Sequence, residues 1–263
     1  MYYPRPIHLA VLMVVFGVFV RVGSAQLLET ETARLPKKRV LELASNFEFQ
    51  TSSEGREYAV PLAVEYGVTD RLEFLVEPVA YTAIRPATGP RAAGIGDLEV
   101  TLTYLLRPES PTAPAFAVAG EVKLPLARNT LIGTGKTDLA GYLIESKRFN
   151  RLDTHANIGY TIVGQPAGAH LKNIFNGAVA ALLPMGPKTE IFGEVLANSA
   201  SVAEEDAASP TSESTITPEA PTGEVVATLG MARYLTPSFK LALGISYDNN
   251  QDIQWRPGII WKF

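Results

Sequence analysis

An alternation of apolar with polar or small residues runs through residues 39–263, and it limits the possible folds of this chain more than any other feature. In the stretch 238–248, every second residue from Phe239 to Tyr247 is apolar, and the residues between them include Lys240 and Ser246. A period of two is typical of β-strands whose two faces meet different surroundings. The sequence therefore predicts an all-β fold.

Twelve stretches of this kind follow one another, most of them 11 or 12 residues long. Strands of globular proteins average about 5–6 residues, whereas a tilted strand needs about 9–11 residues to cross a membrane. An even strand number places both chain ends on the same side of a closed barrel. We therefore expect a transmembrane antiparallel up-and-down β-barrel of about 12 strands. The predicted strands are 39–50, 57–67, 71–82, 97–107, 114–126, 138–149, 153–164, 172–184, 188–198, 223–235, 238–248 and 252–263.

The predicted connections are short at one end of the barrel and longer at the other. Five turns contain 17 residues together, whereas six loops contain 65. Short periplasmic turns and longer outer loops are typical of bacterial outer-membrane barrels. The longest loop, 199–222, has five acidic residues and no basic one, so we expect it to be mobile and solvated, with no assigned role.

The N-terminus has the features of an export signal. Arg5 and His8 precede an apolar run from Leu9 to Val20, and small residues end at Ala25. This 12-residue run is shorter than the roughly 20 residues that a transmembrane helix needs. A short N-terminal membrane anchor is the alternative. The predicted organisation is a cleaved signal peptide at 1–25, a periplasmic segment at 26–38 and an outer-membrane β-barrel at 39–263.

Aromatic residues recur eight positions apart on the predicted outer face. Eight residues rise roughly 26 Å along a strand, or about 20 Å across a membrane when the strand is tilted. This distance is close to the apolar band between the two aromatic girdles of outer-membrane barrels. Aromatic residues at the ends of a soluble β-sandwich are the alternative. The predicted girdle residues are Tyr58, Tyr66, Phe239, Tyr247, Trp255 and Phe263.

Charged residues gather on the predicted inner face. Ionisable residues at membrane depth are tolerated where they face water or pair with each other. A lining rich in carboxylates favours a channel for cations or polar cargo. A narrow lumen filled by acidic and basic side chains that bridge across it is the alternative. The predicted lumen-lining residues are Glu42, Glu48, Glu65, Glu73, Glu77, Glu99, Glu121, Lys123, Glu145, Lys147, Glu190, Glu194, Lys240 and Arg256, together with Lys262.

The composition argues against most site chemistry. The chain has no cysteine, and its net charge of −4 offers no basic surface for nucleic acid. The motif Gly133-Thr134-Gly135-Lys136-Thr137 lacks the earlier glycine of a phosphate-binding loop. Beyond the signal peptide only His155 and His170 remain, too few for a histidine metal site and without an adjacent serine. We expect no catalytic residue, no metal site and no cofactor; an outer-membrane hydrolase acting through His155 is the remaining enzymatic alternative.

The motifs Gly94-Ile95-Gly96-Asp97-Leu98 and Trp261-Lys262-Phe263 resemble an outer-membrane β-barrel family often called transporter-like, which is associated with the meta-pathway of phenol degradation. The resemblance covers residues from about 35 to 263. It implies passive uptake of small organic molecules, aromatic ones included. Trp261 and Phe263 resemble the terminal signal that the barrel-assembly machinery recognises. The expected partners are outer-membrane lipid, the barrel-assembly machinery and a small solute; a closed structural or surface-interaction barrel is the alternative function.

Overall fold

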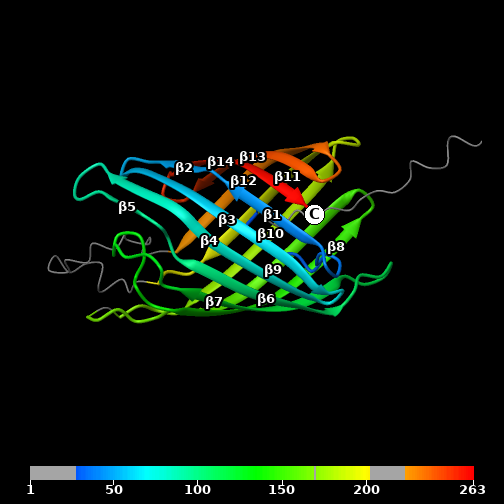
Figure 1. Ribbon diagram of the computed structural model, residues 1–263, viewed down its shortest axis with the longest axis horizontal. Helices are drawn as coiled ribbons and strands as arrows, with labels where there is room; N and C mark the ends of the chain where they lie inside the picture. Colours follow the sequence, from blue (N-terminus) through cyan, green and yellow to red (C-terminus); the bar gives the residue numbers. More distant parts are fainter. Residues whose placement is uncertain (1–27, 169, 202–222) are drawn as a thin grey trace, which may run out of the picture.

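The computed structural model describes residues 28–168, 170–201 and 223–263, so the predicted signal peptide and most of the loop 199–222 lie outside the described residues. The described strands form one antiparallel sheet that closes through the pairing of the first strand with the last. Figure 1 shows the barrel from the side, with the C-terminus at the end that carries the shorter turns. In the described part of the chain, no helix has the length and apolar character needed to cross a membrane.

Fourteen strand segments make up the sheet. They are β1 (Leu41–Asn46), β2 (Glu48–Thr51), β3 (Gly55–Thr69), β4 (Leu72–Pro86), β5 (Ala92–Gly94), β6 (Leu98–Arg107), β7 (Ala115–Leu124), β8 (Asp138–Phe149), β9 (Leu152–Ile162), β10 (Ile174–Pro184), β11 (Thr189–Asn198), β12 (Glu224–Thr236), β13 (Phe239–Asp248) and β14 (Ile253–Lys262).

These segments make twelve barrel strands, because two barrel strands are interrupted. β1 and β2 both lie between β3 and β14, with Phe47 between them. β5 and β6 both pair with β4 and are separated by residues 95–97. The prediction of an up-and-down antiparallel barrel of about 12 strands is therefore confirmed, and each predicted strand overlaps an observed one.

Two prolines within predicted strands lie at irregular places in the sheet. Pro61 follows a register shift between β3 and β4. Pro257 lies opposite the break between β1 and β2, where the backbone N–H of Phe47 donates to the carbonyl of Pro257 over 2.9 Å. Because proline has no N–H to donate to a ladder, a closed barrel accommodates it where the pairing is already interrupted.

The two faces of the sheet differ sharply in polarity. Large apolar side chains cover the outer face, among them Leu229 and Phe175, which are 73% and 67% exposed. The inner face carries buried polar groups such as Thr101 and Lys240, each 1% exposed. An apolar exterior around a polar interior is the arrangement of a transmembrane barrel.

Aromatic side chains lie near both ends of the outer face. At the end with the C-terminus, Trp261 stacks on Phe263 at 4.8 Å between ring centroids and meets Phe239 edge-on at 6.3 Å. At the other end, Tyr58 and Trp255 both pair with Phe49 across neighbouring strands. The exposed rings of Tyr66 and Tyr247 extend these two groups.

Candidate functional site

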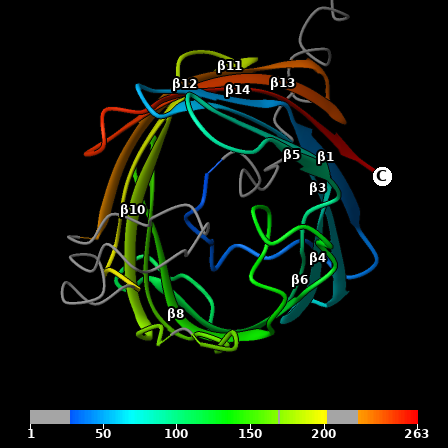
Figure 2. The same cartoon turned by 90° about the vertical axis from the view of Figure 1, so that its left-hand side faces the viewer.

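Residues 28–35 lie inside the barrel and cross its interior. The backbone N–H and the hydroxyl of Thr30 donate to Glu194 Oε2 over 2.6 and 2.5 Å. The backbone N–H of Ala33 donates to Ser146 Oγ over 2.9 Å. The end-on view of Figure 2 shows this N-terminal segment threading through the ring of strands. The sequence pattern predicts a periplasmic segment at 26–38 and gives no sign that part of it enters the lumen.

Apolar contacts hold the segment against two separate parts of the wall. Leu28 belongs to a buried cluster that includes Leu182 on β10 and Phe192 on β11. Ala33 belongs to a second cluster with small residues of β7 and with Ile144 on β8. Since the two clusters are formed by different sets of strands, residues 28–35 bridge the lumen.

Ion pairs hold both ends of the segment. At one end, Arg256 Nη2 on β14 lies 2.5 Å from Glu29 Oε1 and 3.0 Å from Glu48 Oε1. At the other, Arg34 lies 2.6 Å from Glu109 and 2.8 Å from Asp153. These contacts and the surrounding carboxylates make the interior a dense electrostatic network.

A cavity of about 580 Å³ adjoins the segment and has a strongly acidic lining. Arg256 is its one basic lining residue among the described residues, against ten carboxylates, and it is already paired with Glu29 and Glu48. This imbalance of charge favours cations over anions. The lining carboxylates are Glu29, Glu31, Glu48, Glu65, Glu73, Glu77, Asp97, Glu99, Glu121 and Glu224.

Glu31 shows the effect of this environment. Burial is the main cause that raises the pKa of Glu31 to about 7, and the neighbouring carboxylates of Glu121 and Glu29 raise it further. A hydrogen bond from the backbone of Thr32 acts in the opposite direction and lowers this pKa.

Six of the predicted acidic lumen residues line this cavity, namely Glu48, Glu65, Glu73, Glu77, Glu99 and Glu121. Glu29, Glu31, Asp97 and Glu224 do not appear in the sequence-based set.

Other predicted lumen residues lie on the inner face in ion pairs, in which an acidic and a basic side chain neutralise each other. Glu42 Oε1 lies 2.5 Å from Lys262 Nζ, and Glu190 Oε1 lies 3.1 Å from Lys240 Nζ. Lys123 pairs with Asp138 on the neighbouring strand. The interior thus combines bridged charges with the acidic cavity.

The prediction is wrong for Glu145 and Lys147 on β8. Ile144 and Ser146 are 1% and 0% exposed on the inner face, so the alternating residues point outward. In the register of β7 and β8, Glu145 lies opposite the exposed residue Phe116. Lys147 Nζ reaches the turn after β6, where the carbonyl of Ser110 accepts its hydrogen bond over 2.8 Å. The inner face of β8 packs against Ala33 instead, and charge alone did not indicate the face of this weakly alternating strand.

Ser146 and His155 form a buried pair that sequence reasoning missed. Ser146 Oγ lies 2.8 Å from His155 Nδ1, because pairing of β8 with β9 places the two residues opposite each other. The hydroxyl also accepts the N–H of Ala33 and contacts Thr32 Oγ1 at 3.2 Å. A hydrolase needs a nucleophile that its substrate can reach. In the structure residues 32–33 cover the pair, and the Ser146 hydroxyl helps to hold this segment in place.

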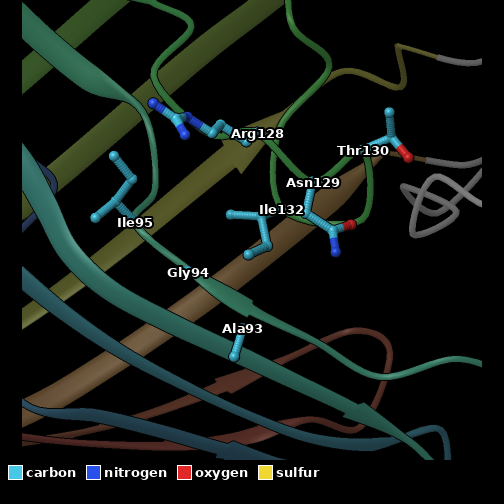
Figure 3. Close-up of a pocket in the computed structure, with 7 residues that line it drawn as sticks. All are labelled: Ala93, Gly94, Ile95, Arg128, Asn129, Thr130 and Ile132. Carbon is cyan, nitrogen blue, oxygen red and sulfur yellow. The ribbon is translucent and has the colours of Figure 1, made fainter.

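The mouth of the barrel at the loop end contains a second cavity of about 630 Å³. It lies between β5 and the loop 125–137, and Figure 3 shows Ile95, Ile132 and Arg128 around it. Asp97 fixes this loop, since its Oδ1 accepts the backbone N–H of Ala127 over 3.0 Å. A Cβ at Gly133 would lie 2.8 Å from Asp97 Oδ2, so this position needs glycine for close approach. The Gly-rich motif therefore packs against an acidic side chain.

No helix follows the Gly-rich motif: residues 138–149 form β8. Across residues 28–168, 170–201 and 223–263, no three histidine, aspartate or glutamate side chains are grouped to hold a metal ion.

Comparison with solved structures identifies the architecture. The COG4313 outer membrane channel from Pseudomonas putida F1 superposes with a TM-score of 0.68 at 10% identity, over 92% of this chain and 100% of that chain. The fold is shared with outer-membrane channels. The NanC porin gives a TM-score of 0.58 at 10% identity over 84% and 100% of the two chains. The KdgM porin in complex with disordered oligogalacturonate gives 0.55 at 7% identity over 84% and 99%. No protein-family model and no curated protein matches this sequence.

Proposed function

We propose that this chain is an outer-membrane channel for the passive passage of small solutes. The observation that carries the proposal is the acidic cavity inside a closed barrel whose outer face is apolar. A polar interior within an apolar shell separates a solute path from lipid. The export signal pattern at 1–25, contact with outer-membrane lipid, and assembly through Trp261 and Phe263 by the barrel-assembly machinery belong to the same proposal.

The charge of the cavity narrows the class of solute. Ten carboxylates and one paired guanidinium favour small cationic or polar molecules over anions. The resemblance to the phenol meta-pathway family adds small aromatic molecules to the proposed solutes. An aromatic solute that carries an amine suits both the charge of the lining and that resemblance.

Uptake into proteoliposomes tests this preference. A labelled four-carbon diamine and a four-carbon dicarboxylate have similar size and opposite charge. We expect the diamine to enter at least tenfold faster. In the double variant Glu77→Gln/Glu99→Gln this ratio should fall severalfold, because both side chains line the cavity.

Glu54→Gln is the control for the substitution itself, since it removes one carboxylate from an exposed loop residue and none from the cavity. It should leave the ratio unchanged. Faster entry of the dicarboxylate, or equal effects of the control and the double variant, would contradict the proposal.

A closed structural barrel is the second candidate, and one observation favours it: residues 28–35 bridge the lumen. Equal exclusion of both solutes by the wild-type protein and by a variant without this segment would favour the structural candidate.

A further inference from the structure

The N-terminal segment stands across the path that a channel needs. Leu28 is buried against β10 and β11, and Ala33 is buried against β7 and β8. Thr30 and the Ser146 hydroxyl complete the bridge with hydrogen bonds of 2.5 to 2.9 Å. We infer that residues 28–35 are a removable plug that closes the lumen and must leave its seat for solutes to pass, an inference that rests on the proposed channel function.

Side-chain contacts hold this plug to the wall. Residues 28–36 belong to none of the strands of the sheet. Its anchors at Glu194, Ser146 and Arg256 each involve a wall side chain. Displacing the plug therefore leaves every ladder hydrogen bond of the barrel in place, whereas removal of a strand would open the sheet.

Residues 36–39 form a clamp at the base of the plug. The backbone N–H of Arg39 donates to the carbonyl of Gly67 over 2.7 Å, and the N–H of Lys38 donates to Asp70 Oδ1 over 3.3 Å. A Cβ at Gly67 would lie 2.2 Å from the carbonyl oxygen of Lys37, so the backbone of Lys37 lies in direct contact with the end of β3. The clamp joins the plug to the turn between β3 and β4, and residues 28–35 can move about it.

Charge within the cavity works against the seated plug. Glu29 and Glu31 add two carboxylates to a lining that already carries eight. Arg256 pairs with Glu29, but it also neutralises Glu48. Like charges in a site of low dielectric constant repel each other strongly. This repulsion offsets part of the anchoring and makes the seated and displaced states closer in free energy.

A reversible cross-link tests the plug directly, since the chain has no cysteine of its own. The hydroxyl of Thr32 lies 3.2 Å from the hydroxyl of Ser146, so the double variant Thr32→Cys/Ser146→Cys places two thiols at one side-chain contact. Oxidation should lock the plug and lower the open-channel current in planar bilayers at least tenfold, and dithiothreitol should restore it. Each single-cysteine variant is a control whose current should not respond to either reagent.

A deletion variant that lacks residues 28–35 and keeps the rest of the chain provides the second measurement. Its folding is checked by heat-modifiable electrophoretic mobility, and its current should be continuous and exceed that of the wild type. Equal currents from the fully oxidised and the reduced double variant would overturn the plug while leaving the channel function intact. Silence of the folded deletion variant would overturn the channel function and the plug with it.

Discussion

The guanidinium of Arg256 joins the last strand of the barrel to the segment that precedes the first strand, with Nη2 2.5 Å from Glu29 Oε1. The same group lies 3.0 Å from Glu48 Oε1 on β2. One buried cation thus neutralises two carboxylates where the N-terminal segment meets the wall. Closure of the barrel and placement of the plug share this residue.

Arg256→Gln should weaken the fold by about 2 kcal/mol. Loss of one partner from a fully buried ion pair costs roughly 3–5 kcal/mol. The expected loss is smaller here because the Glu29 side chain is 55% exposed and can be solvated. Urea titration followed by heat-modifiable mobility measures the change. Arg91→Gln, at an exposed loop position, is the control, and equal midpoints for the two variants would refute this role.

Glu31 should make plugging depend on pH. Its pKa is about 7 in the seated plug and 4.5 in water, so the seated state binds the proton more tightly. Deprotonation therefore favours release, progressively from about pH 4.5 to about pH 7. The open-channel current should rise over this interval in the wild type. Glu31 interacts electrostatically with several titratable groups around it. They are Glu29, Glu65, Glu73, Glu77, Glu121 and Tyr142.

In Glu31→Gln the rise should be markedly smaller, because this side chain stays neutral while the surrounding carboxylates still titrate. The plug should also remain seated longer at pH 7 than in the wild type. Identical pH profiles for the two proteins would show that Glu31 does not control release.

Gly230→Ala should destabilise the barrel by roughly 1–3 kcal/mol, the usual cost of overpacking. A Cβ at this position would lie 2.2 Å from the ring of Phe192 and 2.6 Å from the carbonyl oxygen of Leu243. Gly120→Ala is a matched control, since nothing lies within 4 Å of its added Cβ. The urea midpoint should fall for the first variant and stay for the second; a shift of the same size in both would rule out this steric cause.

Deletion of Phe263 should impair assembly more than conduction. Its backbone N–H donates to the carbonyl of Leu41 over 2.8 Å, and its ring stacks on Trp261 at the closing seam of the barrel. The amount of heat-modifiable protein in the membrane should fall severalfold, while the molecules that fold should keep the wild-type single-channel current. Phe175→Ala, which removes an exposed ring and leaves the residue after β14 in place, should assemble normally. Normal assembly of the deletion variant would contradict this role.

Local pattern was enough to predict the strands. The two faces of a membrane strand differ so strongly that alternation locates β13 and β14 within two residues. The same pattern fails on β8, where Ser146 faces inward and Glu145 outward. There the contact with Ala33, distant in sequence, decides which side chains are buried.

The candidate site was predictable only in part. The alternation of residues along the strands identifies inner-face carboxylates such as Glu77 and Glu99, because these residues lie on strands. It cannot find Glu29 or Glu31, which lie in no strand and enter the lumen through contacts with β9, β11 and β14. The Ser146–His155 contact depends on the register of β8 and β9, which the sequence does not display.

The most direct test of the central claim is a planar-bilayer recording of the purified protein and of the variant without residues 28–35, under a tenfold KCl gradient. We predict gated current from the wild type, continuous current from the deletion variant, and a reversal potential in both that indicates selectivity for K⁺, because carboxylates dominate the cavity. A folded deletion variant that carries no current, or that prefers Cl⁻, would contradict an acidic channel through this barrel.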